Sequence, residues 1–219
     1  MSYLSKTFRE PLSGLTHLVG ALLALIGAID LLVPAIQSRN TLQIIAFSVY
    51  GASLLALYSA SSAYHLLNLS ESGTRTLRRL DHTMIYILIA GSYTPLCLIA
   101  LRGAWGWSLL GVVWGLALAG FILTLFYLNK SRWLTVGIYI LMGWLAVVAF
   151  VPLLQRVPAI GIFWMVLGGV IYSGGAIVYA RKRPDPIPGV FGFHELWHLF
   201  VMAGSAAHFV LIFSVIRFL

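Results

Sequence analysis

Charged residues are scarce in this sequence: they make up 9% of its 219 residues, while 60% are hydrophobic. A water-soluble domain of this size needs a largely polar exterior, which so few charges cannot supply. Cysteine is nearly absent as well. The one residue, Cys97, cannot form an intrachain disulfide, so the sequence gives no sign of an oxidising compartment. Both shortages exclude a soluble or disulfide-stabilised protein and favour one for which lipid is the solvent.

Seven apolar stretches are long enough to cross a bilayer as helices, which takes about 20 residues for roughly 30 Å of hydrocarbon. Backbone groups in lipid must close their hydrogen bonds internally, which favours a helical bundle. We therefore predict an all-α integral membrane protein in which residues 1–219 form a single domain of seven transmembrane helices. Glycine pairs at 168–169 and 174–175 are expected to allow close helix contact. The expected helices are Leu12–Ile36, Gln43–Leu67, Leu80–Leu101, Trp107–Leu128, Leu134–Leu154, Ile160–Ala180 and Phe193–Ile216.

Lysine and arginine are distributed unevenly between the two sides that this topology defines. Loops retained in the cytoplasm are rich in these residues, so we predict a cytoplasmic N-terminus and a C-terminus outside. Topology thereby explains the net charge of +8, and no nucleic-acid partner is expected. The N-terminal side carries ten of the 14 basic residues, Lys6, Arg9, Arg75, Arg78, Arg79, Lys130, Arg132, Arg181, Lys182 and Arg183, and the other side carries Arg39, Arg102, Arg156 and Arg217.

Five of the six histidines are expected at one membrane depth, although they come from four different helices. All five lie close to helix ends that this topology places on the cytoplasmic side. The composition of membrane-spanning segments does not require such a gathering. The five are His17, His65, His82, His194 and His198, and the sixth, His208, lies about 15 Å deeper than His198.

His194 and His198 are four residues apart, so both rings fall on one face of the last helix. Such a pair, joined by a third histidine from another helix, is a common way to build a three-nitrogen zinc site with its fourth position left for water. Asp81, expected at the same depth, could hold that water or accept its proton. Spacing alone leaves an alternative open, in which these polar residues hold helix ends together and Asp81 caps its helix.

Two segments resemble the hemolysin III family of bacterial membrane proteins, which is grouped with the progesterone and adipoQ receptors and, more distantly, with alkaline ceramidases. They are SSAYHLLNLSESGTRTLRRLDHTMIYILIAGSYTPL at residues 61–96 and HELWHLFVMAGSAAHF at residues 194–209. The likeness extends from EPLSGLTH, which begins at residue 10, to the last helix. It implies a zinc ion bound by His65, His194 and His198. It also implies that Asp81 is the nearby carboxylate and that the Ser61 hydroxyl steadies the water on the metal.

The first motif of the family reads E-x-x-N-x-x-x-H in relatives, and here it is Glu10, Ser13 and His17. A serine hydroxyl can replace some hydrogen bonds of the usual asparagine but not its reach, which leaves the supporting role of the first helix open. We expect Glu10 and His17 to support the ligands or to pack between helices rather than to bind metal. His82 is expected to be an interfacial side chain, and His208 could hydrogen-bond across the bundle.

In the related receptors and ceramidases, such a site is associated with hydrolysis of a lipid amide such as ceramide. The resemblance therefore implies a zinc-dependent hydrolase, located in the bacterial inner membrane, with a membrane lipid as its substrate. One alternative is a sensor or regulator of membrane state in which zinc is structural. Another is a lytic or pore-forming protein, which ranks last because the helices lack a polar run that would line a pore. Neither the substrate nor the oligomeric state follows from the sequence.

Overall fold

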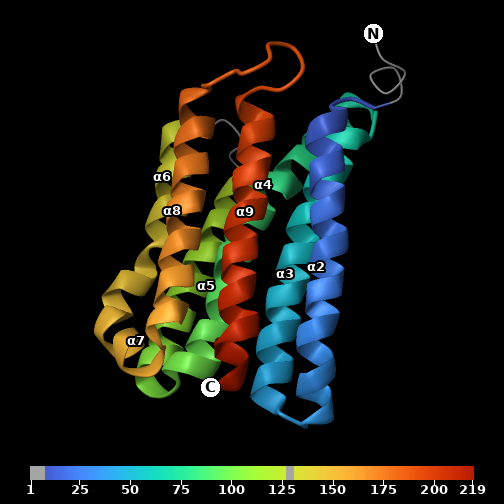
Figure 1. The fold of residues 1–219 in the computed structure, drawn as a ribbon. Coiled ribbons are helices and arrows are strands. Elements are labelled where there is room, and N and C mark those ends of the chain that lie inside the picture. Colours follow the sequence, from blue (N-terminus) through green and yellow to red (C-terminus); the bar gives the residue numbers. More distant parts are fainter. Residues whose placement is uncertain (1–7, 127–130) are drawn as a thin grey trace.

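The chain folds into a bundle of long helices in a computed structural model that describes residues 8–126 and 131–219. Seven helical spans in this part of the chain are long and apolar enough to cross a membrane, which confirms the predicted all-α architecture. Figure 1 shows that the start of the first span and the C-terminus lie at opposite ends of the bundle. Lys6, Lys130 and the predicted helix end at Leu128 lie outside the described residues.

The spans follow the predicted order, and most of their ends lie within a few residues of the expected positions. Four spans are single α-helices over their whole length, and the other three include a π or 3-10 segment. In chain order, with the labels of Figure 1, the elements are α2 (Pro11–Gln37), α3 (Thr41–Leu66), α4 (Glu71–Pro95) continued by a π-helical segment (Leu96–Leu101), α5 (Gly103–Phe126), α6 (Arg132–Gly143), a 3-10 segment (Leu145–Ala149), α7 (Phe150–Arg156), α8 (Ala159–Arg181), α9 (Phe193–Ser214) and a 3-10 turn (Ile216–Phe218).

The third span begins at Glu71 rather than at Leu80, so the predicted start is wrong. Ser70 caps this helix, because its hydroxyl accepts a hydrogen bond from the Gly73 amide at 3.3 Å. Glu71 then places a negative charge in the first turn, where the helix dipole favours it. Hydropathy marks only the lipid-embedded part of a helix, so this polar extension, which carries Arg75, Arg78 and Arg79, was predicted as a loop.

The fifth span is interrupted, whereas the sequence predicted one helix over Leu134–Leu154. Helix α6 ends at Gly143, and a 3-10 segment leads into α7. The hydroxyl of Tyr93 on α4 satisfies the backbone at this break: it donates to the Gly143 carbonyl at 2.8 Å and accepts from the Ala146 amide at 2.9 Å. A side chain from a neighbouring helix therefore replaces the lost helical hydrogen bonds, as backbone buried in lipid requires.

Helix α9 packs closely along α8 and also meets α2, so it lies between the two (Figure 1). Small residues permit the approach to α8, as predicted. A Cβ atom at Gly168 would overlap the His208 ring, and one at Gly175 would overlap Phe200. The His208 ring also donates to the Met165 carbonyl of α8 at 3.3 Å, the expected bond across the bundle. This packing fixes α9 against its neighbours and so fixes the histidines in its first turns.

Substituting Gly168→Ala should destabilise the protein by about 1–3 kcal/mol, because the added methyl group forces the His208 ring out of a packed helix interface. Thermal unfolding of the detergent-solubilised protein measures this change. Gly111→Ala on α5 is the matched control, since a Cβ there meets nothing within 4 Å. A Gly168→Ala protein that unfolds at the same temperature as the Gly111→Ala protein would contradict the tight α8–α9 contact.

Candidate metal centre

Three histidines meet where the end of α3 lies beside the start of α9. His65 stands in the last turn of α3, and His194 and His198 stand in the first two turns of α9. One ring nitrogen of each lies within 4.8 Å of the others, and the Nε2 atoms of His65 and His194 are 3.3 Å apart. We call these residues the three-histidine cluster. The predicted convergence of the two helices is confirmed, and the cluster is positioned to hold a metal ion.

Three imidazoles are a ligand set that zinc accepts, and one nitrogen separation in the cluster matches a tetrahedral zinc site. Nitrogen ligands at 2.0–2.1 Å from zinc stand about 3.3 Å apart along one edge of a tetrahedron, which equals the separation of the His65 and His194 Nε2 atoms. His65 and His198 are almost fully buried, and His194 is half-buried. Three imidazoles would therefore surround an ion with little exposure to bulk water and leave a fourth position open.

Hydrogen bonds to α2 set the tautomers of two cluster rings. His65 Nδ1 donates to Glu10 Oε2 at 2.5 Å, and His198 Nδ1 donates to the Ser13 carbonyl at 2.9 Å. Since both acceptors lack a proton to give, each neutral ring carries its hydrogen on Nδ1 and a lone pair on Nε2. Metal-binding histidines typically have such a partner on the far nitrogen. Two of the three rings thus present the nitrogen that a metal ion needs.

The start of α2 supports the cluster, although Ser13 stands where relatives have asparagine. Glu10 bonds to His65 twice, because its backbone amide also donates to the His65 carbonyl at 2.9 Å. The hydrogen bond from the His65 ring lowers the pKa of Glu10, which keeps this group a carboxylate and a hydrogen-bond acceptor. Ser13 is fully buried and uses its backbone carbonyl, rather than its side chain, to hold His198.

His17 packs against the cluster from one turn further along α2. Its ring stacks on that of His198, with centroids 3.7 Å apart and planes 13° apart, and meets the edge of Tyr58 at 5.0 Å. Neither of its ring nitrogens has a hydrogen-bond partner in the described structure, and both are buried. His17 therefore belongs to the packing around His198, as expected, and lies outside the group of candidate ligands.

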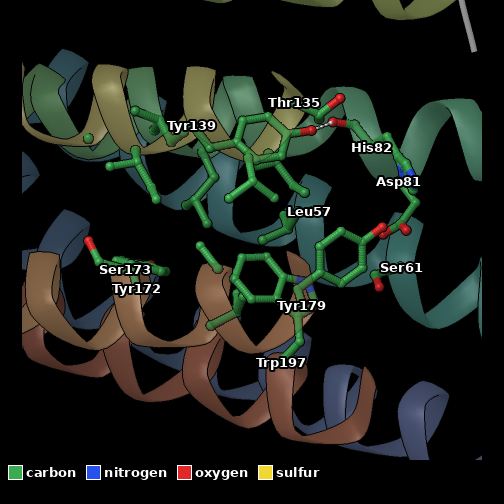
Figure 2. Close-up of a pocket in the computed structure, with 18 of the residues that line it drawn as sticks. Leu57, Ser61, Asp81, His82, Thr135, Tyr139, Tyr172, Ser173, Tyr179 and Trp197 are labelled. Carbon is green, nitrogen blue, oxygen red and sulfur yellow. Dashed lines mark hydrogen bonds between the residues drawn. The ribbon is translucent and has the colours of Figure 1, made fainter. Parts of the chain in front are cut away.

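A cavity of about 310 Å³ opens beside the cluster, and His194 and His198 line it. Asp81 and Ser61, the residues expected to act on the water, line the same cavity. Figure 2 shows them toward one end of it, with Tyr172 and Ser173 toward the other. Most of its wall is apolar or aromatic, and it extends to His208. Asp81, Ser61, His194 and His198 thus border one cavity, while His65 belongs to the cluster without lining the cavity.

His82, predicted as an interfacial side chain, is half-buried. It lines the cavity, and its Nδ1 atom is buried without a hydrogen-bond partner among the described residues. Its backbone carbonyl accepts a hydrogen bond from the Tyr139 hydroxyl at 3.1 Å, drawn in Figure 2. Because α4 begins well before Asp81, both Asp81 and His82 lie inside the bundle wall rather than at the first turn of a helix. This also excludes Asp81 as the helix cap.

Sequence reasoning missed Glu195, which lies between two cluster histidines. Its Oε1 accepts from the Ser13 hydroxyl at 2.7 Å, and its Oε2 accepts from the Gly192 amide at 2.9 Å. A glutamate at the third position of a helix often bonds back to the amide at the cap, so its place in the first turn of α9 was the available signal. Its bond to Ser13 pairs residues 182 positions apart, which no local pattern reveals.

Comparisons with known proteins identify relatives along most of the chain. A family model described as Haemolysin-III related matches residues 5–209. The chain is 38% identical over 200 residues to Hemolysin-3 of Bacillus cereus, covering 91% of this chain and 88% of that protein. It is 37% identical over 205 residues to the Hemolysin-3 homolog of Bacillus subtilis (strain 168), covering 93% and 92% respectively.

A more distant relative comes from animals. The human Monocyte to macrophage differentiation factor is 27% identical over 170 residues, which cover 76% of this chain and 68% of that protein. The family match and the two bacillus relatives span nearly the whole chain, including α2, α3 and α9, which build the three-histidine cluster. This multi-pass membrane protein therefore belongs to the hemolysin III family.

Proposed function

We propose that the protein is a zinc-dependent hydrolase that cleaves an amide bond of a membrane lipid. The observation that carries this proposal is that two members of the three-histidine cluster, His194 and His198, line a cavity whose wall also contains Asp81 and Ser61. A structural zinc site closes all four ligand positions with protein, whereas a catalytic site keeps one for water. The described residues offer three ligands and an adjoining space, which supports a catalytic ion.

Each residue of the cavity's polar end has a role in this reaction. Zinc held by the three-histidine cluster would polarise the amide carbonyl and lower the pKa of a water molecule toward neutrality. Asp81 accepts a proton from that water as it attacks the carbonyl carbon, and then delivers the proton to the nitrogen of the departing amine. The Ser61 hydroxyl holds the attacking water by a hydrogen bond. The products are a fatty acid and an amine.

The shape of the cavity supports a substrate with an acyl chain. It reaches from His198 to His208, which are ten positions apart on α9 and hence separated by about 15 Å along the helix. Apolar and aromatic side chains form most of its wall, so a hydrocarbon chain can lie there with its carbonyl group at the histidine end. We propose that the lipid enters sideways from the bilayer, since the substrate's chain is already dissolved there.

Two other functions remain as rivals. If zinc is purely structural, the protein is a sensor or regulator of membrane state, and no lipid is hydrolysed. The names of the bacillus relatives suggest lysis as a second rival. The interior of the bundle argues against a continuous pore, because large side chains such as Phe47, Tyr50 and Tyr86 fill it. The hydrolase therefore remains the function that the cavity supports best.

We further propose that the protein lies in the bacterial inner membrane with its cluster near the cytoplasm. In a variant lacking Cys97, a cysteine at Ser38 should react with a membrane-impermeant thiol reagent on intact cells, while one at Ser72 should react only after lysis. Both side chains are exposed, at opposite ends of the bundle, and the arginine-rich end is expected inside. The reverse labelling pattern would contradict this orientation.

Purified protein should contain about one zinc ion per chain, and His65→Ala or His194→Ala should remove nearly all of it. Elemental analysis of the detergent-solubilised protein measures this. His208→Ala is the matched control, because it removes a buried histidine that lies outside the cluster and hydrogen-bonds to α8. Equal zinc content in all four proteins would show that the cluster is not the metal site.

Asp81→Asn should lower the turnover of a lipid amide by about 10²–10⁴-fold, because the amide side chain cannot accept the proton of the attacking water. The assay follows fatty acid release from a fluorescent N-acyl lipid in detergent micelles. The zinc content should stay near the wild-type value, since Asp81 is outside the group of candidate ligands. Undetectable turnover by the wild-type protein, with zinc bound, would instead favour the sensor.

A further inference from the structure

Two carboxylates compete for the role of proton acceptor in this site. One is Asp81 on the cavity wall, and the other is Glu195, which completes the sequence His194-Glu195-Leu-Trp-His198. This H-E-x-x-H spacing is the one that metalloproteases use, with the histidines on zinc and the glutamate as general base. The sequence pattern alone would therefore assign the proton transfer to Glu195. The contacts of the two carboxylates distinguish them.

Both oxygens of the Glu195 carboxylate are already engaged in hydrogen bonds. Its two oxygens accept from the Ser13 hydroxyl at 2.7 Å and from the Gly192 amide at 2.9 Å. Glu195 is not among the residues that line the cavity, whereas Asp81 is. A water molecule in the cavity would meet Asp81 and not Glu195.

Ser13 links Glu195 to a candidate ligand. It is fully buried on α2, and its hydroxyl donates to Glu195 while its carbonyl accepts from His198 Nδ1 at 2.9 Å. These two bonds fasten the first turns of α9 to the first turn of α2. A shift of Ser13 therefore moves the carbonyl that sets the orientation of the His198 ring. Such partners of a metal ligand typically change metal affinity by about 10–100-fold when they are removed.

We infer that Glu195 is a positioning residue, which acts through Ser13 to hold the His198 ring in place, and that it is not the general base. This inference rests on the proposed function only in taking the three-histidine cluster as the metal site. Glu195→Gln separates the two roles. Glutamine keeps a side chain of the same length that can hydrogen-bond to Gly192 and Ser13, but it cannot act as a base.

The test measures zinc affinity of the detergent-purified protein by competition with a chromogenic chelator, and the visible spectrum of the protein loaded with cobalt. Glu195→Ala should weaken zinc binding by about 10–100-fold and alter the cobalt spectrum. Ser13→Ala, which leaves the bond between Glu195 and Gly192 intact, should shift the affinity in the same direction. Glu195→Gln should restore most of the affinity lost in Glu195→Ala. Glu71→Ala, an exposed carboxylate of α4 near the same end of the bundle, is the control.

Two results would overturn the inference. One is that Glu195→Ala binds zinc within about twofold of wild type, which would mean that the bond to Ser13 does not position the ligand. The other is that Glu195→Gln keeps its zinc but loses lipid-amide turnover, as a general base would. If the wild-type protein hydrolyses no lipid amide, the proposed function fails, while the affinity and spectral measurements still decide the role of Glu195.

Discussion

The arrangement of this site depends on the hydrogen bonds that join two histidine rings to the first turn of α2. The His65 and His198 rings come from helices far apart in the sequence, and each gives its Nδ1 hydrogen to an acceptor on the same short stretch, residues 10–13. Because these acceptors fix the tautomers, both Nε2 lone pairs are available to an ion. Helices α3 and α9 are thereby brought into register at one depth, and the cluster exists only where all three helices meet.

Burying these polar side chains in a membrane-spanning bundle costs free energy unless their hydrogen-bonding groups have partners. Polar side chains within a membrane-spanning bundle usually face a partner or a cavity, because lipid offers no hydrogen bonds. Glu10, Ser13 and Glu195 satisfy one side of the cluster, while the other side borders the cavity. Nε2 of His65 and Nε2 of His194 hydrogen-bond to each other at 3.3 Å, and a bound cation would take the place of that bond. The polar end of the bundle is therefore organised around that point.

Much of this architecture was predictable from the sequence, because hydropathy over about 20 residues reports directly on the bilayer. The spacing of His194 and His198 and the charge pattern of the loops indicated which helix ends meet. Hydropathy could not locate the start of α4 at Glu71, since that extension is polar, nor the break after Gly143, which depends on the Tyr93 hydroxyl from another helix. The role of Glu195 was not predicted either, because its partner Ser13 is distant in the sequence and close only in the folded structure.

The central claim is that zinc binds the Nε2 atoms of the three-histidine cluster and keeps one position for water. X-ray absorption spectroscopy at the zinc edge of the purified protein tests it most directly. The account predicts three imidazole nitrogens and one oxygen at about 2.0–2.1 Å. A spectrum with sulfur from Cys97 in the coordination sphere, or a fourth protein ligand in place of water, would contradict it.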